Sequence, residues 1–379
     1  MRAYVLTDAS LERYAGRFVW LSLNTEDAKS AAFLKKYPIP ALPTLLVLDA
    51  KHDAVTMRYV GGATVPQLRK LLDDAEKTYR AKSLSSADRL LVRANALASA
   101  GKDAEAAKLY DQALGTAPKA WNAYGRTAES LLFSLSMARD AERCASRALE
   151  LYPRVKGTSS AAGVAASGLS CAIELDAKHA KRAQWIAALE KATREVFNDR
   201  TLTLSGDDRS GLYMSLIDAR DDAKDEAGAK QLRGEWAAFL EKSAAAAKTP
   251  EQRAVYDSHR VAAYLDLGTP EKAIPMLEQS ERDFPDDYNP PARLALAYNA
   301  MKQYDKALAA SDRALARVYG PRKLSVLQTR ADILAAKGDA AGARAVIAQA
   351  VAYAKSLPEG QRSEGRIAYL EKRLASMKQ

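Results

Sequence analysis

The chain has 379 residues, of which 48% are hydrophobic and 27% are charged, a composition typical of globular proteins and not of disordered ones. A single compact core rarely holds so long a chain, so the length predicts two domains or an extended repeat array. The net charge of +10 does not indicate a nucleic-acid partner, because Lys and Arg alternate with Asp and Glu and form no dense basic run. No apolar run is long enough to predict a membrane span.

Three short segments near the N-terminus have strand character. The runs at 18–23 and 44–49 are almost continuously apolar and rich in branched residues. The run at 55–60 alternates between its two faces, as a half-buried strand does. A polar turn separates the second run from the third, so we expect these two to form a hairpin.

Helical patterns separate and follow these strands. A helix is predicted over 25–36, between the first two strands. After Gly61 and Gly62, Thr64 and Gln67 stand in the positions of a capping box at the start of the next helix. The N-terminus itself lies in an amphipathic pattern. The predicted order is therefore helix, strand, helix, strand, strand, helix.

This order resembles the C-terminal portion of the thioredoxin fold over residues 1–82. The resemblance depends on the sequence Tyr-Pro-Ile-Pro-Ala-Leu-Pro-Thr at 37–44 before an apolar strand, and on a later strand that ends in Tyr-Val-Gly-Gly. It implies that Pro43 and Thr44 form the family's cis-proline position, in which the peptide bond before Pro43 is cis and Pro43 faces the redox cysteines. The alternative is an ordinary trans loop before a strand.

The Cys-X-X-Cys motif of that family is absent. Cys144 and Cys171 are the two cysteines, and they lie far downstream in different predicted helices. We expect two reduced, partly buried thiols, with a disulfide as the alternative. The chain begins partway along the helix that carries the motif in the family. Either it starts at an internal methionine, which we favour, or its strands close into a degenerate three-stranded layer.

From residue 83 to 379 the pattern changes to pairs of helices with an internal repeat. A small residue, a large one, an alanine and usually a proline recur at spacings of about four, three and five. The copies resemble tetratricopeptide repeats. Residues 155–250 are less regular, and a capping helix is predicted over 365–377. The copies run through Ala106, Tyr110, Ala113 and Pro118; Ala141, Ala145, Ala148 and Pro153; Ala273, Leu277, Ser280 and Pro285; Ala307, Ser311, Ala314 and Tyr319; and Ala343, Ile347 and Ala350.

Arrays of this kind bind partners along a concave face formed by the first helix of each pair. By repeat position, that groove should include Asn95, His259, Arg293, Leu296, Asn299, Gln328 and Asp332. We expect a protein or peptide partner there. The predicted fold is a mostly α, tetratricopeptide-like solenoid behind an incomplete α/β thioredoxin-like domain.

No catalytic motif, phosphate-binding loop or metal-ligand spacing is present, so the sequence predicts no cofactor, no metal and no enzymatic activity. The predicted function is a non-enzymatic interaction scaffold. The alternative is the C-terminal bulk of a thiol-disulfide oxidoreductase or thioredoxin-like chaperone whose cysteines lie upstream of Met1. As given, the sequence predicts a cytoplasmic protein, and an exported one if upstream residues include a leader.

Overall fold

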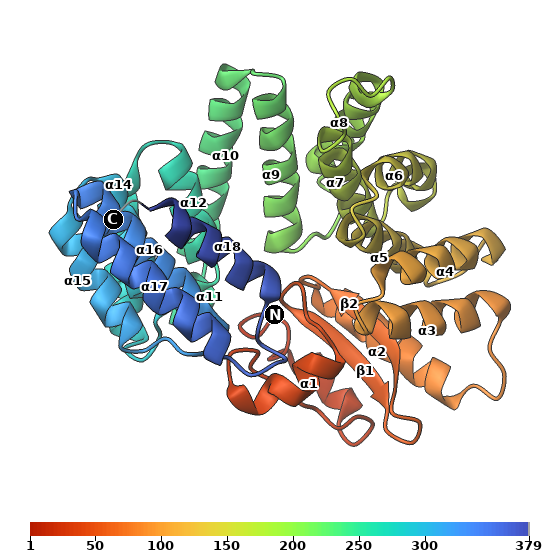
Figure 1. The fold of residues 1–379 in the computed structure, drawn as a ribbon. Coiled ribbons are helices and arrows are strands. Elements are labelled where there is room, and N and C mark those ends of the chain that lie inside the picture. The colour runs from red at the N-terminus through yellow and green to blue at the C-terminus, as the bar shows by residue number, and fades with distance from the viewer. Residues whose placement is uncertain (378–379) are drawn as a thin grey trace. The chain divides into compact units, whose positions relative to one another are not determined.

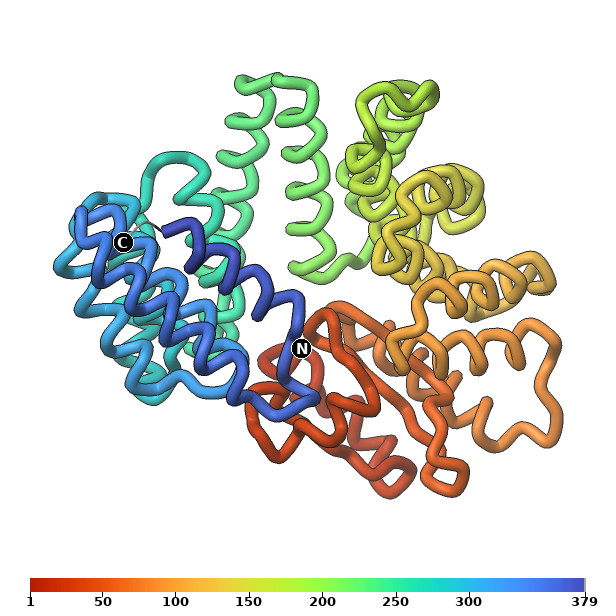
Figure 2. The backbone as a smooth tube through the Cα atoms, in the orientation of Figure 1, coloured from red at the N-terminus to blue at the C-terminus, as the bar shows by residue number. Residues whose placement is uncertain are grey.

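The computed structural model describes residues 1–377 and is mostly helical (Figure 1). It divides into two compact units. The first comprises Met1–Arg17 with Tyr37–Arg233, and the second comprises Phe18–Lys36 with Gly234–Gln379. The stretch 18–36 therefore belongs to the second unit, although the residues on both sides of it belong to the first. Figure 2 shows the backbone coloured by residue number.

The first unit contains a β-hairpin covered by a helix. β1 (Thr44–Asp49) pairs antiparallel with β2 (Ala54–Val60), as predicted. The helix that follows, α2 (Val65–Arg80), begins with the predicted capping box and buries its leucines. The peptide bond before Pro43 is cis. Within the described residues the sheet has these two strands, so the thioredoxin-like assignment stays a proposal.

The predicted strand over 18–23 is wrong. Its side chains are largely in solvent, with Val19 89% and Leu21 79% exposed. No described segment forms a ladder with it, and an extended run without a hydrogen-bonded neighbour is not a strand. The single helix predicted over 25–36 is instead a 3-10 turn, η2 (Ala28–Ser30), followed by the short helix α1 (Ala31–Lys36).

Further helices complete the first unit. They pack in sequence order, and β2 packs against both α3 and α5. The sheet is thereby joined to the first repeats, so the unit extends well past the domain boundary predicted after residue 82. The elements are the N-terminal turn η1 (Ala9–Tyr14) and α3 (Ser86–Ser99), α4 (Asp103–Thr116), α5 (Tyr124–Met137), α6 (Ala141–Val155), α7 (Ser160–Ile173), α8 (Arg182–Asn198) and α9 (Gly206–Asp222). α10 (Glu226–Ala245) crosses the division between the units.

The second unit is a series of helix pairs closed by the predicted capping helix, α18. Its elements are α11 (Pro250–Ala254), α12 (Asp257–Asp266), η3 (Pro270–Lys272), α13 (Ala273–Asp283), α14 (Asn289–Ala300), α15 (Tyr304–Leu315), η4 (Gly320–Arg322), α16 (Lys323–Lys337), α17 (Ala340–Ser356) and α18 (Glu364–Ser376). Neighbouring helices pack pairwise: α14 with α15, α15 with α16, and α16 with α17.

The repeat positions predicted from the sequence lie where helices meet. Alanines 106, 113, 145, 148, 273, 307, 314, 343 and 350 have no exposed surface. A side chain this small lets two helix backbones approach closely, and the larger repeat residues, such as Tyr110 and Leu277, fill the space beside them. The turns within the pairs contain Gly101, Gly268 and Gly338, each with positive φ, which non-glycine residues rarely adopt. The predicted repeat register is confirmed at these positions.

Cys144 and Cys171 form a disulfide, so the prediction of two reduced thiols is wrong. They lie on α6 and α7, which pack against each other. Ala148 and Gly168 lie at that contact, and a Cβ added at Gly168 would be only 2.3 Å from the Cβ of Ala148. This close packing brings the two cysteine Cα atoms to 5.9 Å, within the range of a disulfide.

Ala307→Leu should be among the more damaging single changes in the second unit. The side chain of Ala307 is fully buried, so the added volume must displace neighbouring atoms, at a cost of about 1–3 kcal/mol in the free energy of unfolding. Ala309→Leu, on the exposed side of the same helix, is the control and should change stability little. Equal denaturation midpoints for the two variants would contradict the repeat register.

Replacement of both cysteines by serine should lower the free energy of unfolding by about 2–4 kcal/mol, because the disulfide closes a loop between residues 27 apart and restricts the unfolded chain. Urea titrations with and without reductant measure this. In reductant the wild type and the double variant should have the same midpoint. If two thiols react with a maleimide in the denatured, unreduced protein, the disulfide is absent.

Candidate binding grooves

A groove in the second unit is formed by the first helices of successive repeats. Residues of α14 and α16, together with the segments just before each helix, enclose a cavity of about 150 Å³. Arg293 and Leu296, two of the predicted groove residues, line it, and Leu296 is 40% exposed. Burial lowers the pKa of Arg293, while Asp257 and Asp287 oppose that shift by attracting its charge. The wall therefore combines an apolar side chain with a partly desolvated guanidinium.

A turn of the same chain, at 24–27, is bound beside this groove; the Asp27 amide donates to the carbonyl of Asn24 at 3.2 Å. The Gln361 side-chain amide donates hydrogen bonds to the backbone carbonyls of Thr25, at 2.9 Å, and Asp27, at 3.0 Å. Asn24 donates from its amide to the Tyr319 hydroxyl at 2.7 Å. Since Gln361 is only 8% exposed, its two bonds to the segment are held in a protected environment. Backbone and side chain of the segment are thus both recognised.

The carboxylate of Glu26 is the charged contact of this segment. The Tyr288 hydroxyl donates to its Oε1 atom at 2.9 Å, and the Arg322 Nε atom lies 3.6 Å from the same oxygen. Burial raises the pKa of Glu26, and the bonds from Tyr288 and Arg322 act in the opposite direction. Tyr288 and Arg322 also line the groove cavity. The groove therefore holds an acidic side chain between a phenol and a guanidinium.

Two glycines allow the segment to lie directly on the repeats. A Cβ added at Gly360 would be 1.9 Å from the carbonyl oxygen of Ala31, and one at Gly320 would be 2.2 Å from that of Glu26. Both clashes are with backbone atoms, which cannot rotate away. Lys35 and Glu359 add an ion pair at 2.8 Å at the rim. The absence of side chains at 320 and 360 is thus a requirement for this contact.

Other predicted groove positions in the second unit are used by the fold. Gln328 accepts a hydrogen bond from Arg366, and Asp332 forms an ion pair with Arg373; both arginines lie on α18. His259 lies beside Trp236, with ring centroids 5.6 Å apart. The Oδ1 atom of Asn299 is buried without a hydrogen-bond partner among the described residues. The capping helix thus binds the groove residues of α16.

Asn95, the predicted groove residue of the first repeat, contacts the chain's own sheet. Its side-chain amide donates to the carbonyl of Thr56 on β2 at 3.1 Å, and its Oδ1 atom accepts from the Tyr110 hydroxyl at 2.9 Å. Asn95 is 3% exposed. β2 therefore lies where the repeat pattern would place a partner. No local sequence pattern indicates this contact, because it joins residues 39 apart.

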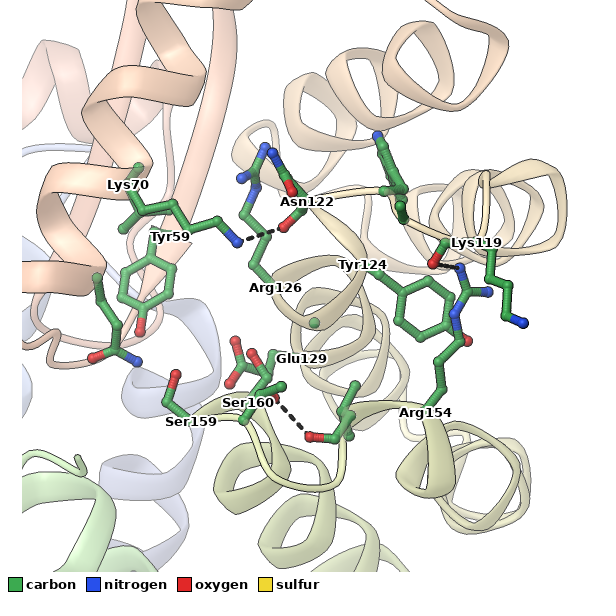
Figure 3. Close-up of a pocket in the computed structure, with 17 residues that line it drawn as sticks. Tyr59, Lys70, Lys119, Asn122, Tyr124, Arg126, Glu129, Arg154, Ser159 and Ser160 are labelled. Carbon is green, nitrogen blue, oxygen red and sulfur yellow. Dashed lines mark hydrogen bonds between the residues drawn. The ribbon is translucent and has the colours of Figure 1, made fainter. Parts of the chain in front are cut away.

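A larger cavity, of about 450 Å³, lies in the first unit between α2, the start of α5, the end of α6 and the start of α7 (Figure 3). Lys70 donates to the backbone carbonyl of Asn122 at 2.8 Å. The Arg154 guanidinium lies 3.6 Å from the centroid of the Tyr124 ring and donates to the carbonyl of Pro118 at 2.8 Å. Several basic side chains therefore surround this space, held in place by backbone carbonyls and an aromatic face.

Glu129 carries a perturbed carboxyl group on the wall of the same cavity (Figure 3). Burial, reinforced by the nearby carboxylate of Asp208, raises the pKa of Glu129 to about 8, although the Ser160 hydroxyl opposes the shift. Burial likewise raises the pKa of Tyr59, the phenol that lines the cavity with it. At neutral pH Glu129 is therefore largely protonated and able to donate a hydrogen bond.

Neither a metal centre nor a membrane span is present in residues 1–377. In this range no cluster of three or more His, Cys, Asp or Glu residues could hold a metal ion. No helix of the same range combines the length and apolar character needed to cross a bilayer. The features that sequence reasoning missed, Gln361, Glu26 and Glu129, have ordinary local patterns and become distinctive only through distant contacts.

No protein-family model matches the sequence, and no curated protein does either. Solved structures similar to the chain include a tetratricopeptide repeat protein from Parabacteroides merdae, at 11% identity and a TM-score of 0.47, covering 77% of this chain and 99% of that one. Another is Acl4, an assembly chaperone of RpL4, at 15% identity and a TM-score of 0.36, covering 77% and 97%. The TPR2AB domain of yeast Sti1, in a complex with pHSP90, has 13% identity and a TM-score of 0.29, covering 76% and 98%. The repeat assignment made here depends on the buried positions and helix pairs described above.

Glu129→Gln should change how stability depends on pH. The pKa of Glu129 is higher in the folded than in the unfolded protein, so the folded state binds more protons between pH 4.5 and about 8. The wild type should therefore lose stability relative to Glu129→Gln as the pH rises through this range, and the two should differ least below it. Denaturant midpoints at pH 5, 6, 7 and 8 measure the difference. Glu105→Gln, at an exposed site, is the control. If the stability of all three proteins depended on pH in the same way, the raised pKa of Glu129 would be contradicted.

Proposed function

We propose that this protein is a non-enzymatic scaffold of tetratricopeptide type whose C-terminal repeats bind an acidic turn of a partner protein. The observation that carries the proposal is the turn at 24–27, which these repeats already hold through its backbone and through one carboxylate. A surface that binds a turn of this protein has the chemistry to bind a similar turn of another one.

The contacts of this surface define a class of ligand. Gln361 donates to two backbone carbonyls, which any peptide offers. Tyr288 and Arg322 bind a carboxylate between them and therefore select an acidic side chain. Arg293 and Leu296 extend the surface beside that contact. The expected ligand is therefore a peptide turn with a glutamate or aspartate, whose backbone lies directly against Gly320.

The other predicted groove residues have different proposed roles. Asn299 and His259 belong to the same series of first helices and are proposed to contribute polar contacts at the edge of the groove. Asn95, Gln328 and Asp332 hold β2 or α18, so we assign them to internal contacts. Residues 1–82 are proposed as a thioredoxin-like element in which Pro43 directly precedes β1 and Thr44 begins it.

The alternative is the C-terminal bulk of a thioredoxin-like oxidoreductase or chaperone whose active-site cysteines lie upstream of Met1. Cys144 and Cys171 do not supply that chemistry, because they are joined to each other, are 0% and 3% exposed, and lie far from Pro43 in the sequence. Thiol chemistry needs an accessible thiolate.

The test is binding of a fluorophore-labelled synthetic peptide to variants that release the chain's own segment. The peptide has the sequence of residues 22–28, which includes Glu26 and ends before Ala31, so a Cβ added at Gly360 does not clash with it. Gly360→Ala places a Cβ against the backbone of Ala31 and should displace the segment. This variant should bind the peptide roughly tenfold more tightly than the wild type, whose groove is occupied. A peptide with glutamine in place of Glu26 should bind more weakly.

Gly365→Ala is the matched control, because an added Cβ there meets only one atom, at 4.0 Å. It should behave as the wild type. The proposal fails if Gly360→Ala, shown to be folded by circular dichroism, binds the peptide no better than Gly365→Ala does. It also fails if the glutamate and glutamine peptides bind equally.

A further inference from the structure

Arg58 on β2 is a buried cation whose hydrogen-bonding capacity is largely unused. Only 4% of the residue is exposed, and its Nε and Nη2 atoms are buried without a hydrogen-bond partner among the described residues. The guanidinium lies 5.2 Å from the centroid of the Phe133 ring. Asp103 and Tyr110 attract its charge but form no ion pair or hydrogen bond with it. A buried charge in this state is costly unless an anionic group reaches it.

The guanidinium lines a cavity of about 150 Å³ that could admit such a group. One wall is the end of β2 and the two glycines after it; the other walls are α5, α7 and the start of α9. The hydroxyls of Ser130 and Ser167 also line the space and can donate hydrogen bonds. A volume of this size holds only a few non-hydrogen atoms beyond a carboxylate.

The two acidic residues of the cavity do not neutralise Arg58. Glu129 and Asp208 both line it, but neither forms an ion pair with the guanidinium. Burial raises the pKa of both carboxyl groups, so at neutral pH Glu129 is mainly protonated and acts as a donor. Two acids close together also disfavour a doubly charged phosphate more than a singly charged carboxylate.

We propose that this cavity is a binding site for a carboxylate group, which pairs with the unused nitrogens of Arg58 and accepts hydrogen bonds from Ser130 and Ser167. A guanidinium offers a carboxylate two parallel donors, a geometry that a point charge cannot match. The site belongs to the first unit and the groove to the second, and the two share no residues, so this proposal does not depend on the proposed function.

The carboxylate has two possible sources, a small free acid or the end of a peptide chain. The cavity shares Tyr59, Arg126 and Glu129 with the adjoining space of about 450 Å³, which could hold the remainder of a longer ligand. Arg126 is already paired with Asp74, so it is a wall residue here and not the anion's main partner. Both sources present the same chemical group to Arg58.

The experiment is calorimetric titration of the whole protein with N-acetylglycine, with the tripeptide Gly-Gly-Ala, and with the same tripeptide as its C-terminal amide. The wild type should bind at least one of the free acids, and Arg58→Met should reduce that affinity by roughly 10- to 100-fold. Arg143→Met, at a half-buried arginine of α6 that is paired with Asp111 on α4 and does not line the cavity, should leave it unchanged. Tighter binding of the tripeptide identifies a chain end as the ligand, and equal or tighter binding of N-acetylglycine identifies a small acid.

A second readout remains valid if Arg58→Met folds poorly. In the wild type the affinity for the carboxylate should fall as the pH rises through about 8, because Glu129 then ionises and repels the ligand. In Glu129→Gln that loss should disappear. Facing groups that could contribute are Asp208 from α9, Tyr59 from β2, and the fixed charges of Arg58 and Arg126.

The proposal is overturned if no free acid binds to the wild type, or if the amide binds as well as the free tripeptide. It is also overturned if folded Arg58→Met retains full affinity, or if wild type and Glu129→Gln share one pH profile.

Discussion

The close approach of antiparallel helices at alanine is the constraint on which most of this structure depends. Where a repeat places alanine at a crossing, two backbones can pack at short distance and a large neighbour fills the space beside them. The nine repeat alanines without exposed surface occur in both units. The same packing brings α6 and α7 close enough for Cys144 and Cys171 to be joined, so the disulfide is a consequence of helix spacing.

The repeats also explain how the chain binds its own segments. Side-chain amides on the helices and on the turns before them are hydrogen-bond donors, and backbone carbonyls of another segment satisfy such donors well. In the first unit Asn95 binds a carbonyl of β2 in this way, and in the second unit Gln361, just before α18, binds two carbonyls of the stretch 24–27. In each unit a surface suited to a partner chain is thus already in use by this chain.

The repeats could be predicted from the sequence because their information is local. Ala307, Ser311 and Ala314 lie on one helix face, and their spacing alone indicates burial. The hairpin and the capping box at Thr64 were predictable for the same reason. Contacts over hundreds of residues were not: Tyr288 meets Glu26 across 262 positions, and no local pattern encodes that pairing. The strand predicted at 18–23 was wrong because a strand needs a hydrogen-bonded neighbouring strand, and the composition of the run does not show whether one is present.

Arg58 and Glu129 show how long-range packing gives side chains properties that no local sequence pattern predicts. Arg58 stands in a β-strand where its neighbours Met57 and Val55 are core residues, and nothing in its local pattern sets it apart. Helices from the repeats remove it from water, and the same helices bury Glu129 and raise its pKa. A cation that keeps its charge and an acid that loses it therefore share one cavity wall. This asymmetry follows from intrinsic acidity, because a guanidinium stays protonated under burial that suffices to neutralise a carboxyl group.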